Sequence, residues 1–151
     1  MDLILWRHAE AEDGGVDLKR SLTKRGRKQA ERMADLLRPR LAGEWRILVS
    51  PAKRALQTVK PLDLAFEERE ALGTSTSPEL VLSEAGWPSG AQSVVVVGHQ
   101  PTLGQVAARL LGTAESELGI RKGAIWWFEA RDRGGSETIL KAVLGPDLLE
   151  S

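Results

Sequence analysis

Short apolar runs that alternate with amphipathic segments constrain the fold of this chain more than any other feature. Three of these runs, Leu3–Trp6, Arg46–Val49 and Val94–Val97, are typical of strands covered on both faces of a parallel sheet. Two further strands are predicted at Ala124–Glu129 and Thr138–Leu144, with no helical segment between them. The pattern predicts an α/β fold with three α/β/α layers around a mostly parallel central sheet of about five strands, one edge of which is antiparallel.

Helices are predicted between the strands from their capping residues and apolar spacing. Thr23 is expected to cap the first helix, and Ser50 the second, with Pro51 at its first position. Ser77-Pro78 repeats this signal for a short helix, and Pro101 opens the last one. The faces expected to cover the sheet are Ala30, Met33, Ala34 and Leu37 in the first helix, Ala55, Leu56 and Val59 in the second, and Leu103, Val106, Ala107, Leu110 and Leu111 in the last.

Length and composition narrow the classes of function. The 151 residues are expected to form one domain, 1–151, which buries about 68–70% of its extended surface. The 21 Lys and Arg residues balance 21 Asp and Glu residues, which argues against a nucleic-acid binder. No apolar run approaches the roughly 20 residues of a membrane span, and the first residues do not resemble a signal peptide. Cysteine is absent, which excludes disulfides and thiolate chemistry. A cytoplasmic protein without a cofactor is expected.

The chain has only two histidines, and each follows a predicted strand. His8 comes after the first strand, directly behind Arg7, and His99 comes after the valine-rich strand. Ligands of open parallel sheets bind beyond the carboxyl ends of the strands, so we expect the two imidazoles to face each other across one site. Arg54 lies at the start of the helix that follows a third strand. Guanidinium groups around two imidazoles suit a phosphoryl group better than a metal ion.

Taken singly, each of these residues could have a structural or solvated role instead of a catalytic one. A lone histidine is more often a hydrogen-bonded structural residue than a catalyst, and a helix-start arginine such as Arg54 is often solvated. The surroundings favour function, because Arg7-His8 leads into a polar loop with Gly14 and Gly15. The helix start near Ser50 offers free N–H groups to an anion. A metal site at His8, Glu10 and Glu12 is rejected, because its spacing matches no zinc motif and the arginines would repel a cation.

Together these segments resemble the histidine phosphatase superfamily, which is also called phosphoglycerate mutase-like. The resemblance lies in the strand-end Arg7-His8, in a Ser-x-x-x-Arg-Ala-x-x-Thr element at residues 50–58, and in Gly98-His99. Ala9 stands where many members carry glycine. Further details resemble the SixA-type phosphohistidine phosphatases, namely Arg7-His8-Ala9-Glu10-Ala11-Glu12, Leu22-Thr23-x-x-Gly26, His99-x-Pro101 and Lys122-Gly123-Ala124. The resemblance covers residues 1 to 145 in the order of the family.

This resemblance implies a phosphatase that acts through a phosphohistidine intermediate on its own chain. His8 is then the nucleophile, Arg7 and Arg54 bind the oxygens of the phosphoryl group, and His99 donates a further hydrogen bond. Surrounding cations are expected to keep His8 neutral, and a backbone carbonyl to set its tautomer. The implied partner is a protein that carries phosphohistidine, or a small phosphorylated substrate, and no metal or cofactor is implied.

The chain departs from the superfamily in one respect, since it has no recognisable acid between Arg54 and His99. The carboxylates of that interval, which are expected to be solvated, are Glu67, Glu68, Glu70, Glu79 and Glu84. Glu10 is the local candidate for a proton donor. An acid is dispensable when imidazole leaves, because its conjugate acid has a pKa of about 6.5. An alkoxide is a far poorer leaving group, with a conjugate-acid pKa on the order of 15, near that of water.

Two other functions stay open at this point. One is a small-molecule phosphomonoesterase in which Glu10, or a carboxylate of the interval 67–84, is the acid. The other is a phosphate-binding module without catalysis, which would have no need of a nucleophile such as His8. A basic cluster is expected either to be solvated or to dock an acidic partner, and it comprises Lys19, Arg20, Lys24, Arg25, Arg27 and Lys28.

Overall fold

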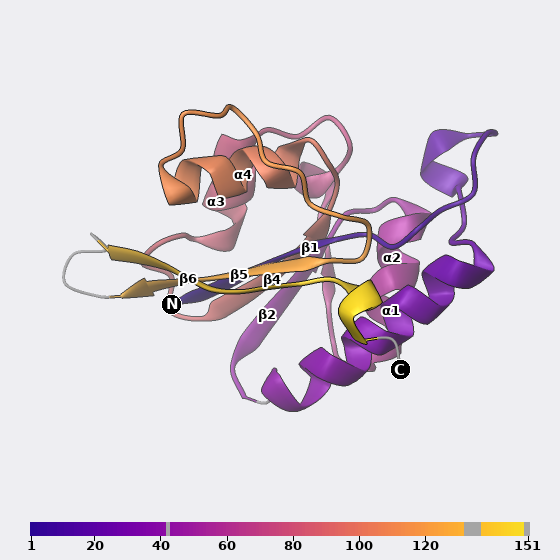
Figure 1. The fold of residues 1–151 in the computed structure, drawn as a ribbon, viewed down its shortest axis with the longest axis horizontal. Helices are drawn as coiled ribbons and strands as arrows, with labels where there is room; N and C mark the ends of the chain where they lie inside the picture. Colours follow the sequence, from indigo (N-terminus) through magenta and orange to yellow (C-terminus); the bar gives the residue numbers. More distant parts are fainter. Residues whose placement is uncertain (42, 132–136, 150–151) are drawn as a thin grey trace.

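A mixed sheet of six strands lies between two layers of helices in the computed structural model, which describes residues 1–41, 43–131 and 137–149 (Figure 1). The strand order is β3-β2-β4-β1-β5-β6. The first four strands of that order pair in parallel, whereas β5 and β6 are antiparallel to their neighbours. The strands are β1 (Asp2–Arg7), β2 (Trp45–Val49), β3 (Glu67–Glu68), β4 (Ser93–Gly98), β5 (Ile125–Arg131) and β6 (Glu137–Leu144). The predicted three-layer α/β/α fold with an antiparallel edge is confirmed.

The expectation of about five strands missed β3. This strand has only two residues, Glu67 and Glu68, and both side chains are exposed. They pair with Leu48 and Val49 of β2 at the edge of the sheet. An exposed edge strand carries no apolar pattern, so this strand has no signal of the kind that revealed the others.

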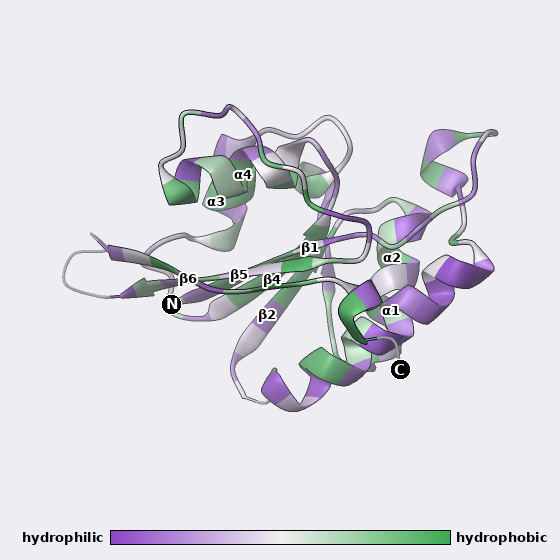
Figure 2. Ribbon diagram, viewed as in Figure 1, coloured by the Kyte–Doolittle hydropathy of each residue, from purple (hydrophilic) through white to green (hydrophobic). Residues whose placement is uncertain are grey.

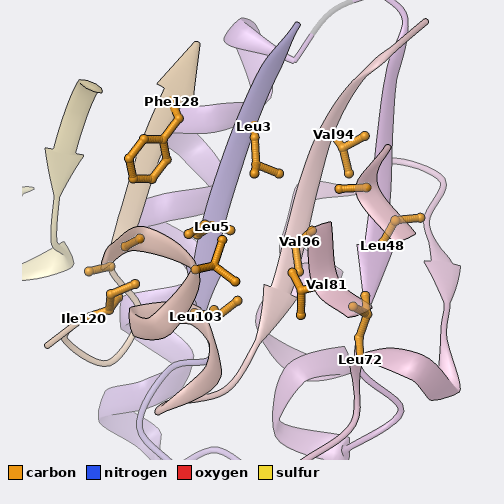
Figure 3. Packing of buried hydrophobic residues seen from close by; sticks show 14 residues of the cluster. Leu3, Leu5, Leu48, Leu72, Val81, Val94, Val96, Leu103, Ile120 and Phe128 are labelled. Atoms are coloured by element: carbon orange, nitrogen blue, oxygen red, sulfur yellow. The ribbon is translucent and has the colours of Figure 1, made fainter. Parts of the chain in front are cut away.

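Two helices cover each face of the sheet (Figure 1). One layer holds α1 (Lys24–Leu37) and α2 (Lys53–Val59), and the other holds α3 (Pro78–Ala85) and α4 (Thr102–Leu111). Successive strand residues point to opposite faces, so Ile4 packs in the cluster with α1 and α2 while Leu5 packs in the cluster with α3 and α4. Figure 3 shows the second cluster, with Leu5 beside Leu103 of α4. In Figure 2, α1 alternates between hydrophilic and hydrophobic segments, as expected for a helix with one buried face.

Most of the predicted helix starts are confirmed, and one was wrong. The Thr23 hydroxyl accepts a hydrogen bond from the N–H of Gly26 at 2.9 Å, and Ser77 caps α3 in the same way. Ser50 does not cap α2, because that helix begins at Lys53 with Ala52 as its N-cap. Ser50 lies in the functional site instead. In α4, Pro101 is the N-cap, and Leu111 is 37% exposed rather than part of the core.

Short 3-10 turns connect several of these elements. They are η1 (Asp17–Lys19), η2 (Arg38–Arg40), η3 (Lys60–Leu62), η4 (Glu70–Leu72) and η5 (Pro146–Leu149). Within the described ranges, no helix combines the length and the hydropathy that a membrane crossing requires.

The parallel register brings three strand ends to one edge of the sheet. Arg7 is aligned with Gly98, so His8 and His99 follow neighbouring strands at the same level. The N–H of His8 donates to the carbonyl of Gly98 at 3.1 Å, and the N–H of Ser50 donates to the carbonyl of Val97 at 3.0 Å. The segments that follow β1, β2 and β4 are therefore held together by backbone hydrogen bonds.

Candidate active site

A cleft of about 320 Å³ lies at these strand ends. It is lined by all four residues that the sequence predicts as the catalytic and phosphate-binding set, Arg7, His8, Arg54 and His99. Other lining residues were not predicted as catalytic or phosphate-binding, and they are Ala11, Asp13, Asp17, Arg20, Thr74, Gln100 and Lys122. Ala11 and Lys122 belong to motifs of the family resemblance and Arg20 to the basic cluster, whereas no local pattern marks the other four.

His8 is held as a neutral imidazole with a defined tautomer. It is only 8% exposed, and its Nδ1 lies 2.7 Å from the carbonyl oxygen of Ala9. A carbonyl can only accept a hydrogen bond, so the proton is on Nδ1 and the lone pair is on Nε2. The sequence led us to expect a backbone carbonyl in this role, and Ala9 supplies it. Nε2 is thus the nitrogen able to attack phosphorus.

The segment that carries His8 is tied to α2 through Thr58. The N–H of Ala9 donates to the Thr58 hydroxyl at 2.9 Å, and that hydroxyl donates to the carbonyl of Arg54 at 2.7 Å. Thr58 is fully buried. The threonine of the motif at residues 50–58 therefore fixes the distance between the nucleophile and Arg54.

The pKa of His8 is lowered to about 4. Burial, which penalises the charged ring, is the largest cause, and the positive charges of Arg54, Arg7 and Arg20 lower this pKa further. The hydrogen bond to Ala9 acts in the opposite direction. Cations were expected to keep His8 neutral, and they contribute, but burial contributes more.

His99 faces His8, with ring centroids 5.2 Å apart and an angle of 56° between the planes. Its Nε2 lies 2.7 Å from the Ser50 hydroxyl, which also accepts the N–H of Ala52 at 3.2 Å. We assign the hydroxyl as the donor to Nε2, because the Ser50 oxygen already accepts from Ala52; in this tautomer the ring proton is on Nδ1. Burial is the largest cause that lowers the pKa of His99 to about 3; a proton on His8 would lower this pKa further, and the positive charge of Arg54 does so, so this ring is also neutral.

Several buried donors of the cleft lack a partner. In the part of the chain that the structure describes, four buried side-chain nitrogen or oxygen atoms make no hydrogen bond, namely Arg7 Nε, Arg54 Nε, His99 Nδ1 and Thr76 Oγ1. Three of the four belong to residues that line the cleft. Buried polar atoms are nearly always hydrogen-bonded in folded proteins, so unpaired donors gathered in one place indicate a site for an anion.

The two arginines are anchored by their other nitrogens. Arg7 Nη1 donates to the carbonyl of Ile120 at 2.8 Å, and burial lowers the pKa of this guanidinium. Arg54 is 3% exposed, and its terminal nitrogens donate to Asp17, at 2.8 Å to the backbone oxygen and 3.3 Å to Oδ2. Both guanidinium groups are therefore oriented before a ligand arrives.

Glu10 is not among the residues that line the cleft. Its Oε2 accepts a hydrogen bond from the Thr23 hydroxyl at 2.8 Å, and its side chain lines a neighbouring pocket. The glutamates at 67–84 do not line the cleft either. Three of them are paired elsewhere: Glu67 with Arg46 and Arg69, Glu79 with Arg109, and Glu84 with Arg69. The carboxylates that line the cleft are Asp13 and Asp17. No three His, Asp or Glu side chains gather as a metal site in the described ranges.

Three members of the basic cluster line three different pockets. Arg20 lines the catalytic cleft, whereas Arg27 lines a separate pocket with Glu31, Gln57, Lys60 and Pro61. Arg25 lines the pocket that contains Glu10, of about 320 Å³, whose other lining residues are Arg7, Gln29, Arg121, Lys122, Pro146 and Asp147. Arg7 and Lys122 line both this pocket and the catalytic cleft, so the two are contiguous.

Comparisons with known proteins agree with this geometry. The family model of the histidine phosphatase superfamily (branch 1) matches residues 3–80. A SixA phosphohistidine phosphatase homolog from Haemophilus influenzae is 31% identical over 128 residues, which cover 74% of this chain and 78% of the relative.

Solved structures of similar proteins share the whole fold. The histidine phosphatase SixA complexed with tungstate superposes with a TM-score of 0.80 at 25% identity, covering 99% of this chain and 100% of that one. A protein described as a SixA phosphohistidine phosphatase from Agrobacterium tumefaciens gives a TM-score of 0.78 at 26% identity, with 96% and 98% coverage. Both neighbours span the length of the chain.

Proposed function

This chain belongs to the histidine phosphatase superfamily and resembles its SixA phosphohistidine phosphatases, and on that premise we propose that it dephosphorylates phosphohistidine on a partner protein. The observation that carries this proposal is the set of buried, unpaired donors on Arg7, Arg54 and His99 around the neutral ring of His8. A phosphoryl group between them would accept hydrogen bonds from all three residues. The SixA relative whose structure holds tungstate, a phosphate-like anion, supports the same reading.

In the first step, the lone pair on His8 Nε2 attacks phosphorus while the P–N bond of the substrate breaks. The electron pair of that bond returns to the departing ring nitrogen. Arg7, Arg54 and His99 stabilise the charge on the phosphoryl oxygens. Water then attacks the phosphorus of phosphorylated His8, and the P–Nε2 bond breaks with its electron pair returning to Nε2. The protons of water leave with the released phosphate, which restores the free enzyme.

The acids near the cleft favour a P–N substrate over a phosphomonoester. Glu10 is bonded to Thr23, and Asp17 is bonded to two arginines, so neither is poised as a proton donor. The other carboxylate that lines the cleft, Asp13, is exposed to solvent. A substrate imidazole that carries a proton on its other nitrogen departs as a neutral ring, since imidazole has a pKa of about 6.5. Such a leaving group needs no acid from the enzyme.

Trapping the covalent intermediate tests this mechanism. Turnover of a protein phosphorylated on histidine should yield, after rapid quenching, an acid-labile and base-stable phosphoenzyme that maps to His8. The rate for this substrate should exceed that for a panel of phosphomonoesters. Full activity in His8→Ala would refute the nucleophile, and a large preference for a monoester would favour the small-molecule phosphatase instead.

The pocket next to the cleft supports docking of an acidic partner surface. Arg25 and Lys122 have no ion-pair partner among the described residues, and Arg121 contacts Asp147 only at 3.8 Å with both side chains largely exposed. Such an exposed pair is weak and leaves the arginine available. These cations would attract carboxylates that flank the phosphohistidine.

Charge reversal on α1 tests this docking with a matched control. Arg25→Glu should raise KM for a phosphohistidine protein, more strongly at low salt, where screening is weaker. Arg27→Glu makes the same charge change on another side of the same helix and should leave KM unchanged. Equal effects of the two variants would show that only net charge matters and would refute docking at this pocket.

A further inference from the structure

Asp17 contacts two arginines of the catalytic cleft, and the mechanism above gives this residue no role. Its Oδ1 accepts hydrogen bonds from Arg20, from Nε at 3.2 Å and from Nη2 at 3.1 Å. Its Oδ2 accepts from Nη2 of Arg54 at 3.3 Å, and its backbone oxygen accepts from Nη1 of Arg54 at 2.8 Å. One aspartate thus binds both terminal nitrogens of Arg54 and anchors Arg20 beside it.

The loop between β1 and α1 is shaped to bring Asp17 to this place. Gly14 and Gly15 have φ values of 79° and 73°, which let the chain reverse before η1. The N–H of Glu12 donates to the carbonyl of Ser21 at 2.8 Å, so the two ends of the loop are held together by a backbone hydrogen bond. Nη1 of Arg20 also donates to the carbonyl of Glu12, at 3.0 Å. Arg20 is therefore held through three of its nitrogens.

Asp17 also offsets charge in a crowded region. Arg7, Arg20 and Arg54 bring three guanidinium groups to one cleft, and the Arg54 side chain is only 4% exposed. A buried charge is costly without a partner of opposite sign. Burial raises the pKa of Asp17, but the hydrogen bonds and charges of Arg20 and Arg54 outweigh this and lower it, so the carboxylate stays ionised.

The bonds to Asp17 leave other N–H groups for a ligand. On Arg54 the buried Nε has no partner, and each terminal nitrogen keeps a further hydrogen. On Arg20 the terminal nitrogens likewise keep hydrogens that Asp17 and Glu12 do not use. Arg20 lines the same cleft as Arg7, Arg54 and His99, so its guanidinium faces the space where a phosphoryl group would bind.

We infer that Asp17 is a positioning residue that orients Arg54 and Arg20 toward the phosphoryl group, so that Arg20 becomes a third phosphate-binding guanidinium beside Arg7 and Arg54. This assignment rests on the proposed phosphoryl chemistry of the site. In the opposite role, Asp17 would compete with the ligand: its carboxylate would bind Arg54 in the free enzyme and would be displaced when phosphate binds. The two roles predict opposite changes in anion affinity when Asp17 loses its charge.

Binding of orthovanadate and inorganic phosphate to the free enzyme, measured by titration calorimetry, separates these roles without any substrate. Asp17→Asn and Arg20→Ala should each weaken vanadate binding by about tenfold, the scale for losing one charge-assisted hydrogen bond. The double variant should bind about as well as Asp17→Asn alone, because loss of the Asp17 charge already leaves Arg20 without its orienting partner. Asp17→Glu, which keeps the charge, should bind more tightly than Asp17→Asn.

Asp35→Asn is the matched control. Asp35 pairs with Arg38 at 3.1 Å with the same sequence spacing as Asp17 and Arg20, but on α1 outside the cleft. This variant should bind vanadate like the wild-type protein. Circular dichroism and the thermal unfolding midpoint of every variant check that the fold is retained.

Four results would overturn the assignment. Tighter binding of either anion in Asp17→Asn would make Asp17 a competitor. Additive losses in the double variant would show that Asp17 and Arg20 act independently. Unchanged affinity in both single variants, with wild-type protein that binds both anions, would remove Asp17 and Arg20 from the site and leave the proposed function intact. A wild-type protein that binds neither anion would instead overturn the proposed function together with this inference.

Discussion

Lowering the pH tests the burial of His8 directly. The folded protein holds the pKa of this ring at about 4, whereas the unfolded chain has an ordinary value of about 6.5. At pH 5 about 90% of folded His8 is then neutral, compared with about 3% of an unperturbed histidine. The nucleophile should therefore remain competent at a pH where an exposed histidine is almost fully protonated.

The same difference makes stability depend on pH. Below pH 6.5 the unfolded chain takes up a proton on His8 that the folded protein does not, so the free energy of unfolding falls as the pH falls. Between pH 7.5 and 5 this linkage amounts to about 2 kcal/mol for His8. His99, whose pKa of about 3 is also depressed by burial, acts in the same direction. Most carboxyl groups titrate below the range from pH 7.5 to pH 5, so they contribute little to the change in stability over that range.

Two measurements check this reasoning. Because the chain has only two histidines, their ring Cε1–H signals can be followed by NMR, and neither should titrate with a midpoint above pH 5. Urea unfolding at pH 7.5 and pH 5 should show that His8→Gln loses about 2 kcal/mol less stability than the wild-type protein. A ring midpoint near 6.5 for His8, or an equal loss in both proteins, would refute the argument.

Other consequences of the site are open to direct measurement. Arg54→Ala and His99→Ala should each lower turnover by about a hundredfold while circular dichroism shows a retained fold, because each removes a donor to the transition state; unfolding without a separate catalytic defect would point to structural roles. Glu10→Gln should leave the rate for a phosphohistidine substrate unchanged, since Glu10 is bonded to Thr23 outside the cleft; a lower rate, together with loss of the fall in rate at high pH, would make Glu10 the proton donor after all. Gly26→Ala should lower stability by about 1–3 kcal/mol in calorimetry, because its Cβ would collide with the carbonyl of Glu10; an unchanged midpoint would contradict this packing. Excess chelator should not change turnover, whereas a loss restored by zinc or magnesium would contradict the metal-free mechanism.

Local patterns were enough to predict most of the fold. Apolar runs revealed five of the strands, and hydroxyl caps at Thr23 and Ser77 marked two helix starts. These signals are local because a covered strand or a capped helix depends on residues near it in sequence. The strand β3 was not predicted, because an exposed edge strand does not need apolar residues. Ser50 was wrongly predicted as a helix cap, because a serine before a helix can also form a hydrogen bond with a distant side chain, here that of His99.

The sequence by itself also identified the candidate residues at the strand ends, Arg7, His8, Arg54 and His99, since their motifs stand in the order of a known family. Only the tertiary structure decided what these side chains touch. Burial of His8 depends on helices and loops packed around it, which no neighbouring residue reveals. Glu10 follows His8 closely, yet the path of the chain turns its carboxylate to Thr23.

The partners of the arginines depend on tertiary structure in the same way. Asp17 meets Arg54 across 37 positions of sequence, and Lys122 reaches the cleft from beyond the last parallel strand. A hydrogen bond or an ion pair between distant segments depends on distances of a few ångströms, which are set when the helices and loops pack on the sheet. A sequence pattern records which residues can do chemistry, whereas pKa values and the direction of each donor follow from that packing.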